Sequence, residues 1–249
     1  MLNSAIKKAI SPIFLVAIFA SCIEAQTKWL WDFEGTLGTQ KIGFTLHSAK
    51  INEFVRGHDL DCSYFYVRFL KDIRLRCNIE DDGSFNFVEL DENGNSRETI
   101  HGIFVDNKID VLEGKRTDSG NGRTLAFKLR LSQGTGGDAA HRYGAIDAPN
   151  DKEFERKVQA FRNAVLNGRK QTVVSFIQFP ITVEIGKKRT RIRNKLSFLK
   201  NYDKILDKDF VEEVRKTIPH NLFHRDIGAM LGNGSIWFWG DGKVIAINN

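Results

Sequence analysis

The sequence is poor in cysteine and proline and lacks any specific catalytic motif. It holds three Cys and four Pro among 249 residues, against nineteen Phe. No G-x-S-x-G elbow is present, and the glycine-rich segments "TDSGNG" and "SQGTGG" do not lie between a strand and a helix, as a phosphate-binding loop must. Few prolines beside many phenylalanines favour β-rich, aromatically packed domains. The missing motifs make an enzyme the less favoured class, and we expect no cofactor and no metal site.

Long apolar runs are absent beyond the first 26 residues, "MLNSAIKKAISPIFLVAIFASCIEAQ". This stretch has two lysines, an apolar run from Ile10 to Ala20 and then small residues, which is the pattern of a secretory signal peptide. The run is too short for an ordinary membrane span. Cleavage after "IEA" releases a soluble protein that begins at Gln26, whereas "FASC" resembles a lipoprotein box with Cys22 as the lipid anchor. We expect residues 1–25 to be a signal peptide and the product to be periplasmic, with the soluble form favoured over the lipoprotein.

The two remaining cysteines, Cys62 and Cys77, suit one disulfide in an oxidising compartment. They flank a hairpin, "CSYFYVRFLKDIRLRC". A turn near Leu70 and Lys71 would pair Cys62 with Ile79 instead, so the bridge requires a register shift or a bulge. The sequence leaves both the bonded and the reduced state open.

The first half of the mature chain, residues 26–132, indicates an antiparallel β domain. Short strand-like runs alternate with turn sequences such as "DDG", "DENG" and "TDSGNG". Strands of about six residues with such frequent turns are typical of a meander or a small barrel. This half resembles the small β-barrel modules of bacterial envelope proteins. Residues 133–149 are rich in Gly and Ala and are interpreted as a linker.

The second half, residues 150–249, predicts an α+β domain. Asn150 with Glu153 three residues later begins a helix whose apolar face carries Phe154, Val158 and Phe161. Further helical segments follow, and "IGAML", "SIWFW" and "KVIAI" close the chain as strands.

The segments "FRNAVLNGRKQTVVSFIQFPITVEIG" and "GSIWFWGDGKVIAIN" resemble the cone-shaped α+β fold of nuclear transport factor two and ketosteroid isomerase. The resemblance implies helices packed on a curved antiparallel sheet. This fold hosts isomerases, dehydratases, binding modules and toxin-immunity proteins, so it does not specify a function. An isomerase-like pocket needs a carboxylate base and a Tyr or acid donor that converge. The candidates are Tyr202, Asp203, His220 and His224, although adjacent helical residues point in different directions and the two histidines lack a third metal ligand.

Positive charge is concentrated in the second half. Residues 26–149 hold 16 Lys and Arg against 19 Asp and Glu, a net charge of −3, whereas residues 150–249 hold 19 against 11, a net charge of +8. Six cations crowd the segment "GKKRTRIRNK": Lys187, Lys188, Arg189, Arg191, Arg193 and Lys195. A strand there presents Arg189, Arg191 and Arg193 on one side. This basic stripe is either a solvated edge strand protected by charge or a binding surface for an acidic partner.

The closing hairpin raises a second candidate surface. A turn at Asp241-Gly242 pairs Trp237 with Ala246 and Phe238 with Ile245. The face with Trp237 and Trp239 is then apolar, like the opposite face. Burial of both faces is the favoured interpretation, and a binding surface is the alternative.

These observations favour an exported, non-enzymatic protein that binds an acidic surface of another protein, as an inhibitor or toxin-immunity protein. Export argues against a nucleic-acid partner, and membrane contact is expected only if Cys22 is lipidated. The alternatives are a small-molecule binder or isomerase-like enzyme that uses the C-terminal cone, and a structural lipoprotein.

Overall fold

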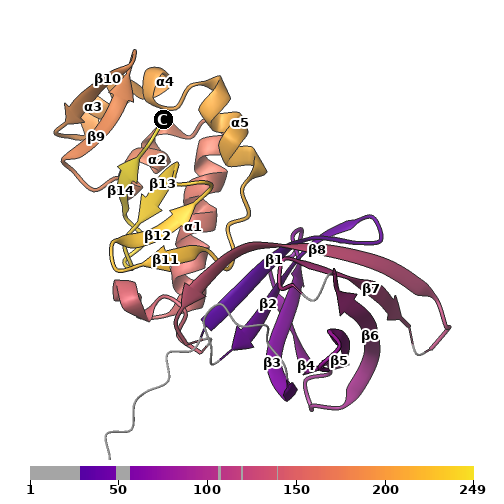
Figure 1. Ribbon diagram of the computed structural model, residues 1–249. Helices are drawn as coiled ribbons and strands as arrows, with labels where there is room; N and C mark the ends of the chain where they lie inside the picture. Colours follow the sequence, from indigo (N-terminus) through magenta and orange to yellow (C-terminus); the bar gives the residue numbers. More distant parts are fainter. Residues whose placement is uncertain (1–28, 49–56, 106–107, 119, 139) are drawn as a thin grey trace, which may run out of the picture.

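The first part of the chain is a closed antiparallel β-barrel (Figure 1). The computed structural model describes residues 29–48, 57–105, 108–118, 120–138 and 140–249. Each barrel strand pairs with the next, and β1 closes the barrel by pairing with β8. The strands are β1 (Trp29–Leu37), β2 (Gln40–Ser48), β3 (Gly57–Tyr66), β4 (Asp72–Ile79), β5 (Ser84–Leu90), β6 (Ser96–Phe104), β7 (Val111–Thr117) and β8 (Thr124–Gly136). The antiparallel β domain is therefore confirmed, and it takes the barrel form.

Alternation of apolar side chains fills the barrel interior. Cys77 on β4 and Phe85 and Phe87 on β5 are buried, while the residues between them are more exposed. The rings of Phe85 and Phe87 stack with their centroids 4.2 Å apart, and Phe44 stacks on Phe87 at 5.3 Å. A cavity of only about 20 Å³ is left among these side chains, which is room for about one water molecule. The interior is thus a packed core and not a ligand chamber at this point.

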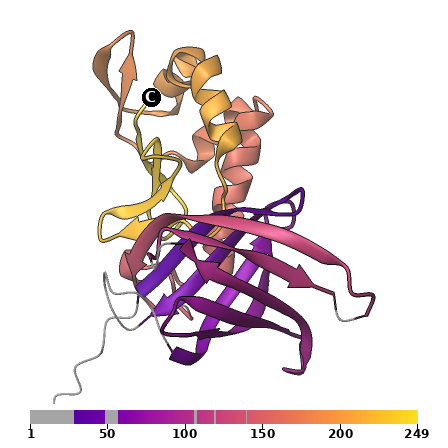
Figure 2. The same ribbon diagram turned by 45° about the vertical axis from the view of Figure 1, so that its right-hand side comes forward.

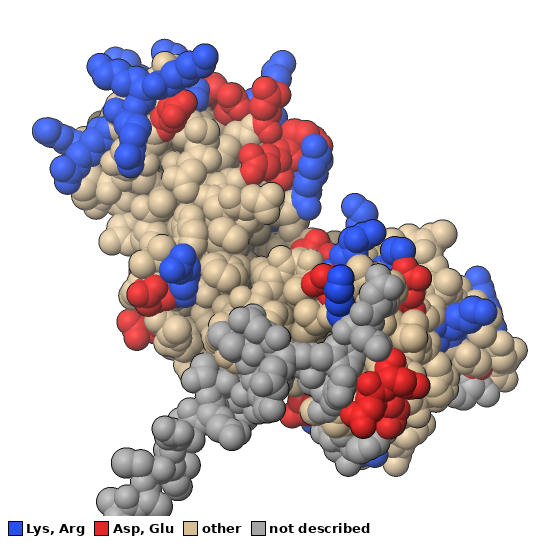
Figure 3. All heavy atoms as spheres, viewed as in Figure 1, with Lys and Arg blue, Asp and Glu red and all other residues tan. Residues whose placement is uncertain are grey.

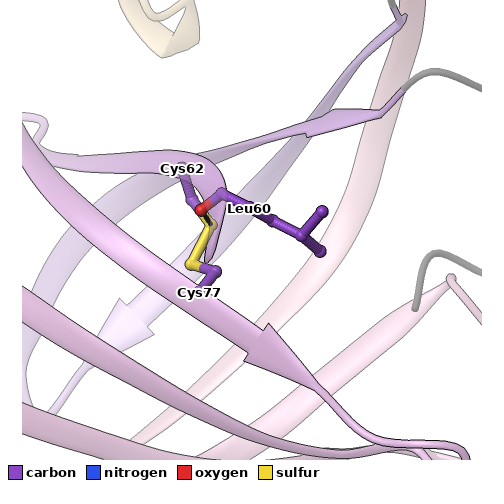
Figure 4. Close-up of a disulfide and its surroundings, with 3 residues drawn as sticks. All are labelled: Leu60, Cys62 and Cys77. Carbon is purple, nitrogen blue, oxygen red and sulfur yellow. Dashed lines mark hydrogen bonds between the residues drawn. A yellow bond between two sulfur atoms is a disulfide. The ribbon is translucent and has the colours of Figure 1, made fainter. Parts of the chain in front are cut away.

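A disulfide joins Cys62 on β3 to Cys77 on β4 (Figure 4). The expected register was wrong. Cys62 lies opposite Leu75 and Leu60 lies opposite Cys77, so the two cysteines are diagonal neighbours on one face with their Cα atoms 6.2 Å apart. The turn between the strands is centred earlier than expected, with Leu70 in the left-handed region at φ 52°. This register shift, one of the two alternatives that the sequence left open, brings the sulfur atoms together.

The second part consists of helices and two small antiparallel sheets. The helices are α1 (Asp151–Leu166), α2 (Lys170–Phe176), α3 (Lys195–Lys200), α4 (Tyr202–Ile205) and α5 (Lys208–Lys216), preceded by the 3-10 turn η2 (Gly144–Ile146). One sheet is the hairpin of β9 (Ile181–Ile185) and β10 (Lys188–Ile192); the other is the meander of β11 (Phe223–Arg225), β12 (Gly228–Leu231), β13 (Ile236–Phe238) and β14 (Val244–Ile247). The chain as a whole is α+β, as expected.

Helix α1 covers the inner face of the β11–β14 sheet. The Asn150 side chain accepts the N–H of Glu153, which caps the helix as the sequence predicted. Phe161 of α1 contacts the ring of Phe238 edge-on at 5.3 Å, and both side chains are fully buried. Within the described residues the antiparallel strands form two separate sheets, so the single curved sheet of the cone-shaped fold is not reproduced. Large side chains such as Phe154, Phe161 and Phe198 pack in the core of this part.

The segment expected to be a linker packs between the two parts. Residues 133–136 belong to β8 and pair with β1. Arg142 and Tyr143 are buried, and Tyr143 has no exposed surface. Figures 1 and 2 both show the C-terminal part seated against one side of the barrel near β1 and β8. The connection is therefore a packed interface.

Candidate functional site

The basic stripe lies on the β9–β10 hairpin, at the end of the C-terminal part that is farthest from the barrel (Figure 1). The strand register places Ile192 opposite Ile181 and Thr190 opposite Val183, which turns one face into the core. Arg189 and Arg191 alternate with these residues and point to the other face. All six cations of the stripe are exposed, from Lys187 to Lys195. Figure 3 shows Lys and Arg gathered at this end of the molecule.

Nothing acidic neutralises this stripe within the part of the chain that the structure describes. None of its six side chains forms an ion pair with a carboxylate, although Glu184 on β9 lies directly opposite Arg189. The hairpin is held by its backbone, because the Asn249 side chain accepts the Glu184 N–H at 2.9 Å and donates to the Glu184 carbonyl at 2.7 Å. The fold therefore anchors the backbone of the hairpin, and the cationic side chains of the stripe remain exposed.

The turn of the hairpin carries one cation in a strained conformation. Gly186 and Lys187 have φ values of 58° and 63°, the left-handed pair of a two-residue hairpin turn. Glycine and asparagine adopt this region readily, whereas lysine does so at a cost of about 1–2 kcal/mol. The turn of the β9–β10 hairpin thus carries a lysine at a position whose backbone conformation favours glycine or asparagine.

Trp237 and Trp239 are both half-buried, between the two expected outcomes of full burial and full exposure. Trp237 pairs with Ala246 as expected, but a bulge then places Phe238 opposite Val244 instead of Ile245. The Trp237 indole donates to the Gly234 carbonyl at 3.1 Å, so its polar atom is satisfied. Trp237 lies on the outer face of the sheet, and Phe238 lies on the inner face.

The four residues of the alternative pocket do not converge. Asp203 is mostly exposed and pairs with Lys170, whose ammonium lies 2.6 Å from its carboxylate. Tyr202 is buried in the C-terminal core. His220 and His224 are buried where the C-terminal part meets the barrel, in a loop and on β11 instead of on a shared helix face. Among the described residues no group of His, Cys, Asp and Glu side chains is arranged to hold a metal ion.

His220 bridges two carboxylates on opposite sides of the interface. Its Nδ1 bonds to Glu155 of α1, and its Nε2 lies 3.1 Å from Asp72 of the barrel. Burial alone would lower the pKa of His220, but the hydrogen bonds to Asp72 and Glu155 raise it to about 9. The imidazolium that results donates to both carboxylates. Tyr143 adds a fourth group, since its hydroxyl donates to Glu155 at 2.6 Å.

A second ion pair is buried nearby. Arg142 donates two hydrogen bonds of 2.8 Å to the carboxylate of Asp32 on β1, and Thr45 of β2 donates a third to the same carboxylate at 2.6 Å. Burial would raise the pKa of Asp32, but Arg142 outweighs it and holds the pKa below its usual value. Gln133 donates to Asp32 and to the Asn221 carbonyl, which ties the barrel to the loop of His220.

His224 lies at the same interface but has no hydrogen-bond partner for its ring among the described residues. Its residue is 3% exposed, and neither ring nitrogen has a hydrogen-bond partner within the described chain. Burial, followed by the positive charge of Arg142, lowers its pKa to about 4. The His224 imidazole is therefore neutral at pH 7 and buried without a hydrogen-bond partner in the described chain.

A cavity of about 590 Å³ opens beside this network, between the barrel and the α5–β12 region. Its walls combine aromatic side chains such as Phe65 and Phe223 with polar groups such as Glu34, Lys216 and Asn233. The sequence reasoning did not find this cavity, because its lining comes from segments far apart in the chain.

Comparison of the chain with protein-family models, with curated proteins and with solved structures finds no match. Among the described residues, no helix is both long and apolar enough to cross a membrane. The expected signal peptide and the expected lipid anchor Cys22 lie outside the described residues. The candidate function therefore rests on the surfaces of this molecule alone.

Proposed function

We propose that this chain is an exported, non-enzymatic binding protein that engages an acidic surface of another protein, as an inhibitor or toxin-immunity protein. One observation carries the proposal: the six exposed cations of the β9–β10 hairpin and the residues that follow it form no ion pair within the described chain. Charge complementarity of this kind speeds encounter with an acidic partner and selects against basic ones. The disulfide between Cys62 and Cys77 supports an oxidising compartment.

Protection of a sheet edge does not account for the whole stripe. Strand β10 is an edge strand, and its charges would discourage pairing with another chain. Lys187 lies in the turn, however, and Arg193 and Lys195 lie beyond the end of β10. These three cations protect no exposed strand backbone, so they support a binding role.

The cone-shaped fold adds no support to the immunity role, because its single curved sheet is not found among the described residues. The isomerase-like alternative needs convergent pocket residues. Tyr202, Asp203, His220 and His224 are dispersed here, which counts against that alternative.

A pull-down compares three forms of residues 26–249 on envelope and toxin preparations. The test variant reverses Lys188, Arg189, Arg191 and Arg193 to Glu. The control variant reverses four exposed barrel cations, Lys71, Arg74, Lys115 and Arg130, and so changes the net charge by the same amount. We expect one protein to be captured by the native form and the control but not by the test variant. Equal recovery by all three forms, or none by any, contradicts the proposal.

A second candidate is a small-molecule binder, favoured by the interdomain cavity of about 590 Å³. This volume lies in the range of ordinary ligand sites. Native mass spectrometry of protein purified from its source detects a bound molecule directly. A mass equal to that of the chain alone, both before and after unfolding, contradicts this candidate.

A further inference from the structure

One line of apolar residues crosses all four strands on the outer face of the β11–β14 sheet. Backbone register aligns Phe223 with Met230, Met230 with Trp237, and Trp237 with Ala246. All four are half-buried, and Phe223 and Met230 also line the cavity beside the barrel. We call this line of four residues the outer row.

The solvent-facing side of an antiparallel sheet is normally polar. The outer row is apolar, although exposed Arg225 of β11 lies on the same face as Phe223. Figure 3 shows an uncharged area over β13 and β14, with Lys and Arg gathered above it and further charged side chains below it, toward the barrel. With neighbouring strands about 4.8 Å apart, the outer row spans about 14 Å, which is the scale of a contact core and not of one stray side chain.

The outer row and the basic stripe belong to one continuous side of the C-terminal part. Strand β14 lies next to β9, so the apolar row ends where the basic hairpin begins (Figure 1). An apolar centre with Trp and Met, bordered by charge, is the anatomy of a protein-binding surface. Trp is also the residue type most enriched among binding hot spots.

We infer that the outer row is the apolar contact core of the same interface that the basic stripe borders. The inference rests on the proposed function and adds the chemistry of the partner. The partner is a protein that presents an aromatic or aliphatic patch flanked by carboxylates. Trp237 fills the centre of the contact, and the stripe from Lys187 to Lys195 pairs with the flanking acids.

Charge and apolar contact are separable by experiment. The probes are poly-glutamate, which offers carboxylates only, and a glutamate–tyrosine copolymer, which adds aromatic groups. The test variants are Trp237→Ala and Met230→Gln, the second of which keeps side-chain volume in case the first fails to fold. The matched control is Phe69→Ser, which removes an aromatic side chain that is 63% exposed on the barrel.

We expect the native protein to bind the copolymer at least tenfold more tightly than poly-glutamate. Trp237→Ala and Met230→Gln should reduce this ratio toward one and leave poly-glutamate affinity unchanged, and Phe69→Ser should change neither. Reversal of the stripe to Glu should abolish binding of both polymers.

The outcomes separate the two proposals. Failure of both polymers to bind the native protein overturns the proposed function and the inference with it. Equal affinity for both polymers, unaffected by Trp237→Ala, overturns the inference alone. Tighter binding to phosphatidylglycerol vesicles than to either polymer identifies a lipid surface and also overturns it.

Discussion

The barrel and the C-terminal part differ in the sign of their net charge and in whether they leave a strand edge free. The barrel has a net charge of −3, and strands β1 to β8 close on one another so that no strand edge is left unpaired. The C-terminal part has a net charge of +8, leaves β10 as an edge and places its cations there without acidic partners in the described chain. Closure removes the sites at which a sheet recruits partners. Under the proposed function, the barrel would serve as support and the C-terminal part as the binding surface.

Buried charged side chains lie at the interface between the two parts. Arg142 with Asp32, and His220 with Glu155 and Asp72, join segments that are far apart in the chain. Buried ion pairs contribute little when intact but cost much when one partner is lost. The interface thus fixes the orientation of the parts more than it adds to their stability, and it offers the sharpest way to test the comparison.

The largest effect is expected from Arg142→Ala. This change leaves the buried Asp32 carboxylate without its cation and should lower the free energy of unfolding by about 3–5 kcal/mol. Denaturant unfolding measures it. Arg156→Ala is the control, because Arg156 is exposed and pairs only with Glu153, and it should cost less than about 0.5 kcal/mol.

The pair itself is replaceable if its role is orientation. Arg142→Met combined with Asp32→Leu should recover most of the lost stability, because neither charge then remains buried. A double variant as unstable as Arg142→Ala would show that the pair stabilises the fold directly.

The next effect belongs to the barrel alone. Replacement of Cys62 and Cys77 by Ser opens a loop of 15 residues and should destabilise the barrel by about 3 kcal/mol. Urea unfolding with and without a reductant measures this for the native chain. Acidic-polymer binding by the C-terminal part should not change, and a matching loss of binding would contradict the division of roles.

Alkaline pH should weaken the interface through His220. The folded pKa of about 9 lies above the ordinary value of about 6.5, so the stabilisation is fully present below pH 6.5 and is lost as pH rises through 9. Between pH 7 and 10 the free energy of unfolding of the native chain should fall by about 2 kcal/mol more than that of His220→Gln. Unfolding curves at both pH values measure it, with His101→Gln, at an exposed barrel position, as the control.

The expected NMR signature of His220 is independent of stability. At neutral pH both ring nitrogens should be protonated, and Asp72→Asn should lower the pKa of His220 because one of its two carboxylate partners becomes neutral. A His220 titration near pH 6.5 would show that the imidazole does not bridge Glu155 and Asp72.

Acid should act on His224 in the opposite sense. Its folded pKa of about 4 lies below the ordinary value, so the unfolded chain takes up a proton first and stability falls as pH drops from about 6.5 to 4. His224→Phe removes this titration and should reduce the acid sensitivity by about 1–2 kcal/mol. Unfolding at pH 7 and pH 4.5 measures the difference. A variant as acid-sensitive as the native chain would contradict it.

Local patterns predicted most of the elements but not the interface. Period-two alternation along "SFNFVEL" puts Phe85 and Phe87 on one strand face, which is the buried face in the structure, and the Asn150 cap marked the start of α1. These features depend on neighbours within a few residues. The turn of the Cys62–Cys77 hairpin contains Leu70 in the left-handed conformation, which no residue pattern predicts. The bulge near Phe238, which was also not predicted, shifted the register of the closing hairpin.

The buried charges escaped prediction because their partners are distant in the chain. Arg142 lies in a Gly- and Ala-rich segment that suggested a linker, and Glu155 follows Phe154 on a helix where an acidic residue usually faces solvent. Asp32 is 110 positions from Arg142, and Glu155 is 65 positions from His220. The sequence showed the dense cations from Lys187 to Lys195, whereas only the structure shows that they are exposed. Arg193 lies beyond the end of β10, so it does not share a strand side with Arg189 and Arg191 as expected.

The smallest expected effect distinguishes binding from stability at one residue. Lys187 has φ 63°, which asparagine tolerates better than lysine, so Lys187→Asn should stabilise the chain by about 0.5 kcal/mol. The same change removes a cation from the tip of the stripe and should weaken poly-glutamate binding by about twofold, in proportion to one charge of six. Thermal unfolding and polymer titration measure the two effects on one sample. A gain in stability with a loss of binding would show that the charge of Lys187 contributes to binding. Unchanged binding would show that the cation at the turn is solvated and takes no part in binding.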